Sequence, residues 1–282
     1  MNVALRIDPP GTRDAPMEAG LGPVLLGMPH LALNGLSETW LLRELGHRHW
    51  LLLARMAGRR VPDFRDRQGH AVYAAFRSVA IADAAFDRVG ENDVLEIVTS
   101  LSRISRTQIR SRHLLFAGGA PLGEVTMVSV FVHRRDGASN HTVARVEIDG
   151  LPAIEPMADD AAPPGGTGHP RPVAAPGAPV ILECTPCPSQ DFNGAGFLYF
   201  TSFVAFADRA EWQLDPAFAR HAITVRREVA YHANLDPGEA ILVRLLEACS
   251  GPTGWRHHCR IERKSDGAVL ADIRSVKRAS QR

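Results

Sequence analysis

Apolar and polar positions repeat with a helical period in two long segments of the chain. In the first, residues 36–56, apolar side chains recur three or four positions apart among charged ones, and Ser37 stands where a helix N-cap is needed. This pattern predicts a helix with one buried face. The second, residues 197–212, is apolar on almost every side for three turns, which predicts a helix that protein surrounds on most sides.

Strand-like segments follow each predicted helix and are separated by Gly or Pro turns. They cover residues 72–82, 93–116 and 124–135 in the first half, and residues 222–232, 240–248, 255–264 and 268–277 in the second half. A lone helix enclosed by a curved antiparallel sheet is the hot-dog arrangement. We therefore predict an α+β double hot-dog. In this fold two antiparallel sheets each wrap a central helix, and a pseudo-twofold axis relates the two units.

The two halves also share an ordered series of features, as expected for an internal repeat. Each has a short apolar run, an Asn-Gly pair, a helix that reaches a Trp, a strand with Arg-x-Val-Ala, and an acidic turn. A tract rich in Pro, Gly and Ala lies between them and disfavours both helix and sheet. We divide the chain into a leader (residues 1–22), a first hot-dog unit (23–149), a linker (150–179) and a second hot-dog unit (180–282).

Composition and charge narrow the class of protein. The chain has 282 residues, 45% of them hydrophobic and 22% charged, which is ordinary for a globular protein. A formal net charge of +1 argues against nucleic acid as a partner. No segment reaches the roughly 20 apolar residues of a membrane helix, and the first residues lack the apolar core of a secretory signal. We expect a cytoplasmic protein without a membrane partner.

Metal and cofactor motifs are weak in this sequence. Cys184 and Cys187 form a Cys-x-x-Cys pair, but no second pair stands at the spacing of a zinc site. No Gly-rich phosphate loop or dinucleotide fingerprint is present. We predict no bound metal and no cofactor.

Several short motifs, taken together, resemble one enzyme family. They are Asp191-Phe192-Asn193-Gly194-Ala195-Gly196, Leu198-Tyr199-Phe200, Asp208-Arg209-Ala210-Glu211-Trp212, Gly27-Met28-Pro29-His30, Gly35-Leu36-Ser37-Glu38 and Arg48-His49-Trp50. From about residue 22 to residue 277 the chain thus resembles the bifunctional acyltransferase/decarboxylase family of leinamycin-type polyketide pathways. The resemblance implies a double hot-dog enzyme that decarboxylates methylmalonyl-CoA and transfers the propionyl group to an acyl carrier protein. Coenzyme A then enters as a substrate, and the essential tyrosine of that family falls on Tyr73.

The chemistry of such a reaction asks mainly for hydrogen-bond donors. Decarboxylation of a malonyl-type thioester needs neither metal nor base, but donors must stabilise the enolate oxygen. We expect the backbone amides near Gly194 and Ala195, beside Asn193, to supply them; the alternative is that this segment is only a turn entering a helix. Tyr73 either becomes acylated or donates a hydrogen bond or a proton.

Other readings of the same residues stay open. Asp191 could activate water in a hot-dog thioesterase acting on acyl-CoA or acyl carrier protein, which is the main alternative, or it could only cap its turn. His30 paired with Asp191 would suit a dehydratase. This hypothesis comes third, together with the hypothesis of a non-catalytic protein that binds an acyl chain or a carrier protein.

A further set of residues is predicted to bind substrate. They are His30, Asn34, Gly35, Arg106 and Arg110. Arg106 and Arg110 share one face of a predicted strand and could bind the phosphates of coenzyme A or the acidic surface of a carrier protein; a solvated charged face is the simpler alternative. We expect a monomer with an internal pseudo-dimer, or a homodimer.

Overall fold

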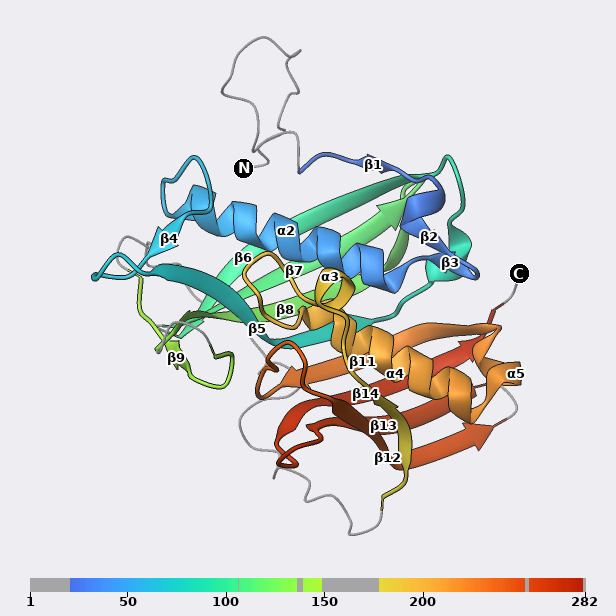
Figure 1. The fold of residues 1–282 in the computed structure, drawn as a ribbon. Helices are drawn as coiled ribbons and strands as arrows, with labels where there is room; N and C mark the ends of the chain where they lie inside the picture. Colours follow the sequence, from blue (N-terminus) through green and yellow to red (C-terminus); the bar gives the residue numbers. More distant parts are fainter. Residues whose placement is uncertain (1–20, 106, 136–138, 149–177, 252–253, 281–282) are drawn as a thin grey trace.

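One antiparallel sheet carrying two long helices forms the body of the molecule (Figure 1). The computed structural model describes residues 21–105, 107–135, 139–148, 178–251 and 254–280. The predicted leader and linker therefore lie outside the described residues, apart from residues 21–22 and 178–179.

The first unit places helix α2 (Glu38–Met56) across four long strands. Ser37 caps this helix, because its hydroxyl accepts the amide hydrogen of Trp40. The long strands are β5 (Ala71–Ala82), β6 (Val94–Ser105), β7 (Gln108–Ala117) and β8 (Ala120–Arg134). The short elements are β1 (Val24–Leu25), η1 (Met28–His30), β2 (Leu31–Ala32), β3 (Gly35–Leu36), β4 (Phe64–Arg65), η2 (Phe86–Arg88) and β9 (Val143–Arg145).

One expectation for this unit is wrong. The segment 93–116 was predicted as a single run, but it forms two strands, β6 and β7, that pair with each other as a hairpin. Arg110 therefore lies on β7, the second strand of this hairpin, and residue 106 is outside the described residues. A turn of two or three residues without Gly or Pro leaves no signal in the hydropathy pattern.

The second unit repeats this plan with helix α4 (Phe200–Leu214). Its other helices are the short α3 (Pro188–Asp191) and α5 (Pro216–Ala219). Its strands are β10 (Val180–Cys184), β11 (Ala222–Tyr231), β12 (Ile241–Gly251), β13 (Gly254–Arg263) and β14 (Val269–Ala279). Helix α4 begins three residues later than predicted, because the backbone of Asn193 pairs with Phe197 and closes a turn before the helix.

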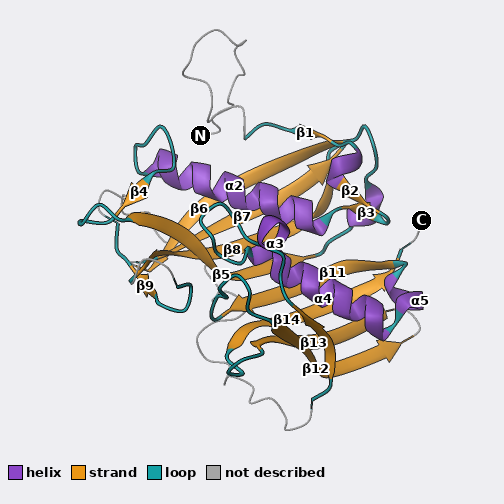
Figure 2. Cartoon of the chain, viewed as in Figure 1, coloured by secondary structure: helices purple, strands orange, loops and turns teal. Residues whose placement is uncertain are grey.

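The two units join through adjacent strands to make a continuous sheet. The strand order is β1-β6-β7-β8-β5-β11-β14-β13-β12-β10, and Val79 of β5 pairs with Val229 of β11 at the join. The order is symmetric about that pair, and α2 and α4 lie on the same face of the sheet (Figure 2). The predicted double hot-dog is therefore confirmed, with both sheets fused edge to edge.

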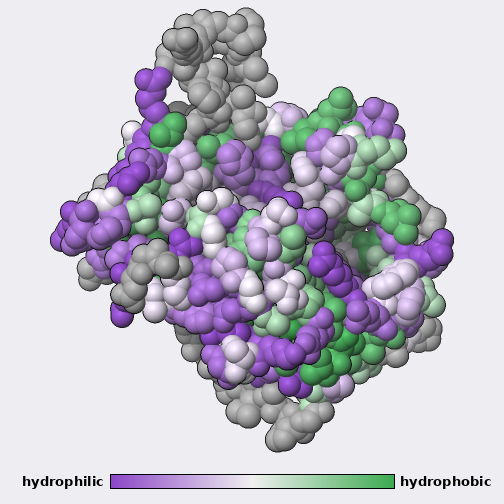
Figure 3. All heavy atoms as spheres, viewed as in Figure 1, coloured by the Kyte–Doolittle hydropathy of each residue, from purple (hydrophilic) through white to green (hydrophobic). Residues whose placement is uncertain are grey.

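Apolar side chains from both units form one main core. Leu41 and Leu45 of α2 and Phe203 and Phe206 of α4 are at most 1% exposed within it. In the space-filling view most of the visible surface is hydrophilic, with an apolar area where α4 and β10 meet (Figure 3). Among the described residues, no helix combines the length and apolar character needed to cross a membrane.

A buried ionic cluster ties the first helix to the second unit. Arg227 of β11, 1% exposed, lies 3.2 Å from Glu38 at the start of α2 and 2.7 Å from Asp208 of α4. Glu211 lies 3.5 Å from Arg227 and also contacts Lys277 of β14. Because these groups come from α2, α4, β11 and β14, the cluster holds the two units in one relative position.

Candidate functional site

A cavity of about 650 Å³ lies where the two hot-dog units meet. Its walls come from α2, β5, β8 and β9 of the first unit, and from the turn before α4 and the end of β11 in the second unit. Tyr73, Asn193, Gly194 and Ala195 all line it, so the structure brings these four predicted residues together. Neither unit forms this cavity alone.

The side chain of Tyr73 lines this cavity. Its ring packs edge-on against Phe197, with 5.6 Å between the ring centroids. Within the described residues the hydroxyl has no hydrogen-bond partner, although the side chain is half-buried. The group is therefore available to donate a hydrogen bond to a ligand.

The turn before α4 supplies fewer free amides than the sequence predicted. The Oδ1 atom of Asn193 accepts the amide hydrogens of Ala195 (3.0 Å) and Phe197 (3.1 Å), so the amide of Ala195 is engaged. The amide of Gly194 has no partner among the described residues. Of the two predicted donors, Gly194 alone is free.

The sequence predicted donors at the start of this helix, and the structure puts that start at Phe200, beyond Gly194 and Ala195. Tyr199, at the N-cap position, provides no side-chain cap, and both Tyr199 and Phe200 line the cavity. The first amides of a helix lack intrahelical partners and lie at the positive end of the helix dipole. The amide of Ser202 bonds the carbonyl of Tyr199, so an oxyanion in this cavity would face the amide of Phe200, the first residue of α4, as well as the amide of Gly194.

Asp191 does not line the cavity. Its buried carboxylate accepts the amide hydrogen of Cys187 at 2.8 Å, and its carbonyl oxygen accepts the amide hydrogen of Tyr199. Asp191 thus holds the turn in the capping role that the sequence allowed as an alternative. Among the described residues that line the cavity, none is Asp or Glu.

The predicted substrate-binding residues lie elsewhere. None of His30, Asn34, Gly35 and Arg110 lines the cavity. The His30 ring packs on Trp40, and the Asn34 side chain donates to the carbonyl of Arg220 at 2.9 Å, which joins the first unit to the second. Gly35 has a φ of 125° and lies against the backbone of Phe86, where a Cβ would clash.

Their role in binding stays a prediction. Arg110 lies on β7, and Arg106 falls outside the described residues. His30 and Asp191, the pair considered for a dehydratase, do not meet in the cavity.

Two arginines that the sequence did not single out as site residues line the cavity without partners. The side chains of Arg77 (β5) and Arg145 (β9) form no hydrogen bond or ion pair within the described residues. Burial and the nearby charge of Arg145 both lower the pKa of Arg77. Arg227 lies two residues before Val229 of β11, just as Arg77 lies two residues before Val79 of β5, and the two valines pair. The side chain of Arg227, however, is neutralised by carboxylates. The repeated Arg-x-Val-Ala motif was visible in the sequence, whereas the missing partners of Arg77 were not.

His232 is a second residue of the cavity that the sequence did not indicate. Its Nε2 atom lies 3.0 Å from Oδ2 of Asp272, which leaves Nδ1 unengaged. The neighbouring Asn234 bonds both the amide and the carbonyl of Leu198, so this segment packs against the turn before α4. A histidine oriented by a carboxylate is the usual arrangement of a general base.

A buried chain of hydrogen bonds leads from the cavity into the first unit. His49 of α2 lines the cavity and bonds Ser111 (2.8 Å) and Ser129 (2.7 Å) through its two ring nitrogens. His113 continues the chain, with 2.9 Å to Ser111 and 2.8 Å to Thr99. Burial lowers the pKa of both histidines to about 3, so both rings are neutral in the folded protein at pH 7.

Because His49 and His113 are buried and neutral, we expect the unfolding free energy to decrease in acid. A histidine with a pKa near 6.5 in the unfolded chain and about 3 in the fold stabilises the fold fully above pH 6.5. As the pH falls from 6.5 towards 3, we expect each to lower the unfolding free energy by about 1.4 kcal/mol per pH unit. Urea unfolding at several pH values measures this slope. The His113→Gln variant should show a shallower slope, and an unchanged slope would contradict the assignment.

Solved structures of low sequence identity share the fold. No protein-family model and no curated protein matches the chain. An acyl-ACP thioesterase from Bacteroides thetaiotaomicron aligns with a TM-score of 0.66 and 13% identity over 93% of this chain and 99% of its own. The 12:0-ACP thioesterase from Umbellularia californica aligns with a TM-score of 0.67 and 11% identity over 91% of this chain and 96% of its own. The likeness confirms the double hot-dog fold along nearly the whole chain.

Proposed function

We propose that this protein acts on acyl thioesters and hydrolyses acyl groups from an acyl carrier protein in the cavity between its units. The observation that carries the proposal is the convergence of Tyr73, the free amide of Gly194 and the uncapped start of α4 in one cavity. The shared fold of the two acyl-ACP thioesterases supports the choice of substrate class.

Hydrolysis requires an activated water and a stabilised oxyanion. In our mechanism, Nδ1 of His232 takes a proton from water as the water oxygen bonds to the thioester carbon, and Asp272 stabilises the resulting imidazolium. The amide of Gly194, the amide of Phe200 and the hydroxyl of Tyr73 donate to the carbonyl oxygen as it becomes negative. Collapse of the tetrahedral intermediate breaks the C–S bond, and the thiolate recovers the proton from His232.

The unpaired arginines favour a second candidate, decarboxylating acyl transfer. Arg77 and Arg145 meet no carboxylate within the described residues, so they suit an anionic group on the substrate. That anion would be the carboxylate of a malonyl-type acyl group or a phosphate of its carrier. On loss of CO2 the C–C bond electrons form an enolate, whose carbon takes the proton of the Tyr73 hydroxyl, and Tyr73 regains a proton from water. The carrier thiol then bonds to the acyl carbon, the C–S bond to coenzyme A breaks, and the leaving thiolate takes up the proton of the carrier thiol.

One experiment separates the two reactions. The purified protein is incubated with medium-chain acyl carrier protein, and separately with methylmalonyl-CoA plus free carrier protein, and all products are followed by mass spectrometry. We expect free fatty acid and free carrier thiol in the first reaction. Propionyl carrier protein with release of CO2 in the second would favour the transferase, and no turnover in either would contradict both.

Arginine variants test the anion site in the same assay. If Arg77 and Arg145 bind an anion of the substrate, Arg77→Gln and Arg145→Gln should each raise KM for that substrate by roughly 10- to 100-fold. Arg226→Gln is the matched control, because Arg226 is exposed on β11 and paired with Glu228. Comparing methylmalonyl-CoA with propionyl-CoA shows whether the anion is the acyl carboxylate or a phosphate.

A further inference from the structure

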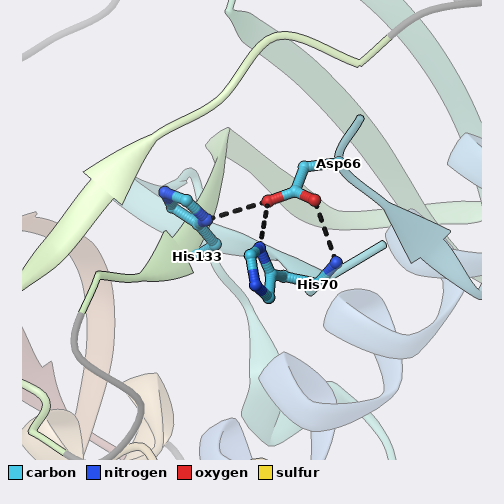
Figure 4. A group of neighbouring side chains, drawn as sticks. All are labelled: Asp66, His70 and His133. Carbon is cyan, nitrogen blue, oxygen red and sulfur yellow. Dashed lines mark hydrogen bonds and ion pairs between the residues drawn. The ribbon is translucent and has the colours of Figure 1, made fainter. Parts of the chain in front are cut away.

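Three potential metal ligands converge at one end of the first unit. Asp66 and His70 bracket the turn between β4 and β5, and His133 comes from β8 (Figure 4). The Oδ2 atom of Asp66 lies 3.1 Å from Nδ1 of His70 and 3.0 Å from Nδ1 of His133. Both imidazole rings therefore direct their Nδ1 atoms at Oδ2 of Asp66. None of the three lines the cavity between the units.

The backbone of the turn orients the carboxylate. The Oδ1 atom of Asp66 accepts the amide hydrogens of Gln68 and His70, both at 2.9 Å. Gly69 makes the turn possible with a φ of 85°, and the amide of Asp66 bonds the carbonyl of His70. Since Oδ1 is fully engaged, Oδ2 is left to face the histidines. Hydrogen bonds of this kind to the second oxygen commonly hold a carboxylate ligand in place.

The spacing and exposure of the three groups suit a small divalent cation. Zinc bonds of about 2.0–2.1 Å to nitrogen and oxygen place tetrahedral ligand atoms about 3.3 Å apart. Oδ2 of Asp66 lies 3.1 Å from Nδ1 of His70 and 3.0 Å from Nδ1 of His133, so these atoms need to move apart only slightly to admit the ion. The Asp66 side chain is 3% exposed and that of His133 is 23% exposed, whereas that of His70 is 67% exposed. The cluster thus combines an anchored interior side with an outer side open to water.

We propose that Asp66, His70 and His133 form a zinc site, with water as the fourth ligand. Two neutral imidazoles and one carboxylate are ligands that zinc commonly takes, and the open position distinguishes the site from a closed structural one. The bound ion links the β4–β5 turn to β8 at the end of the first sheet. The cysteine spacing and short motifs of the sequence predict no metal, whereas His133 is brought to Asp66 by the sheet.

Zinc titration of the full-length, untagged protein tests the site. After removal of metal with a chelator, calorimetry should show one zinc ion bound per chain, and Co2+ should give the visible absorption of a low-symmetry site. His70→Gln is expected to weaken binding by roughly 10-fold or more. The His70 side chain is largely exposed, so we expect this variant to keep the fold, and circular dichroism checks that. The matched control is His221→Gln, which removes another exposed histidine and should leave binding unchanged.

Two further variants decide where any bound zinc lies. His133→Gln removes the ligand from β8 and should weaken binding as His70→Gln does. His141→Gln alters the second histidine–carboxylate group, which includes Asp236 and Glu239, and should not change the binding. The proposal is overturned if no stoichiometric zinc binding is seen. It is equally overturned if binding survives in His70→Gln and His133→Gln, or is lost only in His141→Gln.

Discussion

Replacing Tyr73 with phenylalanine is expected to lower kcat for thioester turnover by about 100-fold or more, with little change in KM. The reason is that the hydroxyl has no hydrogen-bond partner among the residues that the structure describes, so it is free to stabilise charge or move a proton when substrate reacts. The phenylalanine ring keeps the edge-on contact with Phe197. Steady-state kinetics on the substrate identified by mass spectrometry measure the effect.

A second variant separates the hydroxyl from the ring. Tyr73→Leu removes both, so it should be about as slow as Tyr73→Phe if the hydroxyl is the active group. If Tyr73→Phe stays within a few-fold of the wild type and only Tyr73→Leu is slow, Tyr73 acts by packing alone. Circular dichroism and thermal unfolding of both variants confirm that the sheet is intact.

Replacing Arg227 with methionine is expected to lower the unfolding free energy by about 3–5 kcal/mol. The guanidinium group is buried and faces Glu38, Asp208 and Glu211. Its removal leaves these three carboxylates with Lys277, which contacts Asp208 and Glu211, and with the His257 ring, which contacts Glu211. Burial already raises the pKa of Glu38 while Arg227 opposes that rise, so losing Arg227 leaves a buried charge uncompensated. Urea unfolding at pH 7 measures the loss.

The neighbouring arginine supplies the control for this prediction. Arg226→Met removes an exposed ion pair with Glu228, for which we expect a loss of at most about 1 kcal/mol. The loss of unfolding free energy in Arg227→Met should become smaller as the pH falls, because the unpaired carboxylates then take up protons. A loss below that of Arg226→Met, or one independent of pH, would show that the ionic cluster does not hold the units together.

The fold could be predicted from the sequence in most of its parts. Burial of one helix face and of nearly all of α4 is encoded in local hydropathy periods, and the α2 and β11 segments lie close to their predicted positions. The repeat of helix followed by strands identified the double hot-dog arrangement. The β6–β7 turn was missed, since it contains neither Gly nor Pro and a strand pattern continues through it.

The candidate site was predictable only in part. Tyr73 and Gly194 were named from motifs, and the structure places both in one cavity. Asp191 was named too, but its carboxylate is engaged by the amide of Cys187 outside the cavity. His232 carried no motif, because its orientation depends on Asp272 across a strand pair.

The chain itself determines which segments are buried and in what order they come, because hydropathy is a local property that each helix or strand satisfies separately. Only the tertiary structure decides which polar groups meet. Arg77 and Arg227 share a motif, yet one has no partner within the described residues and the other faces three carboxylates. Partners of this kind depend on strand register and on how the helices pack, and a shift of one residue in register turns a side chain to the opposite face of the sheet.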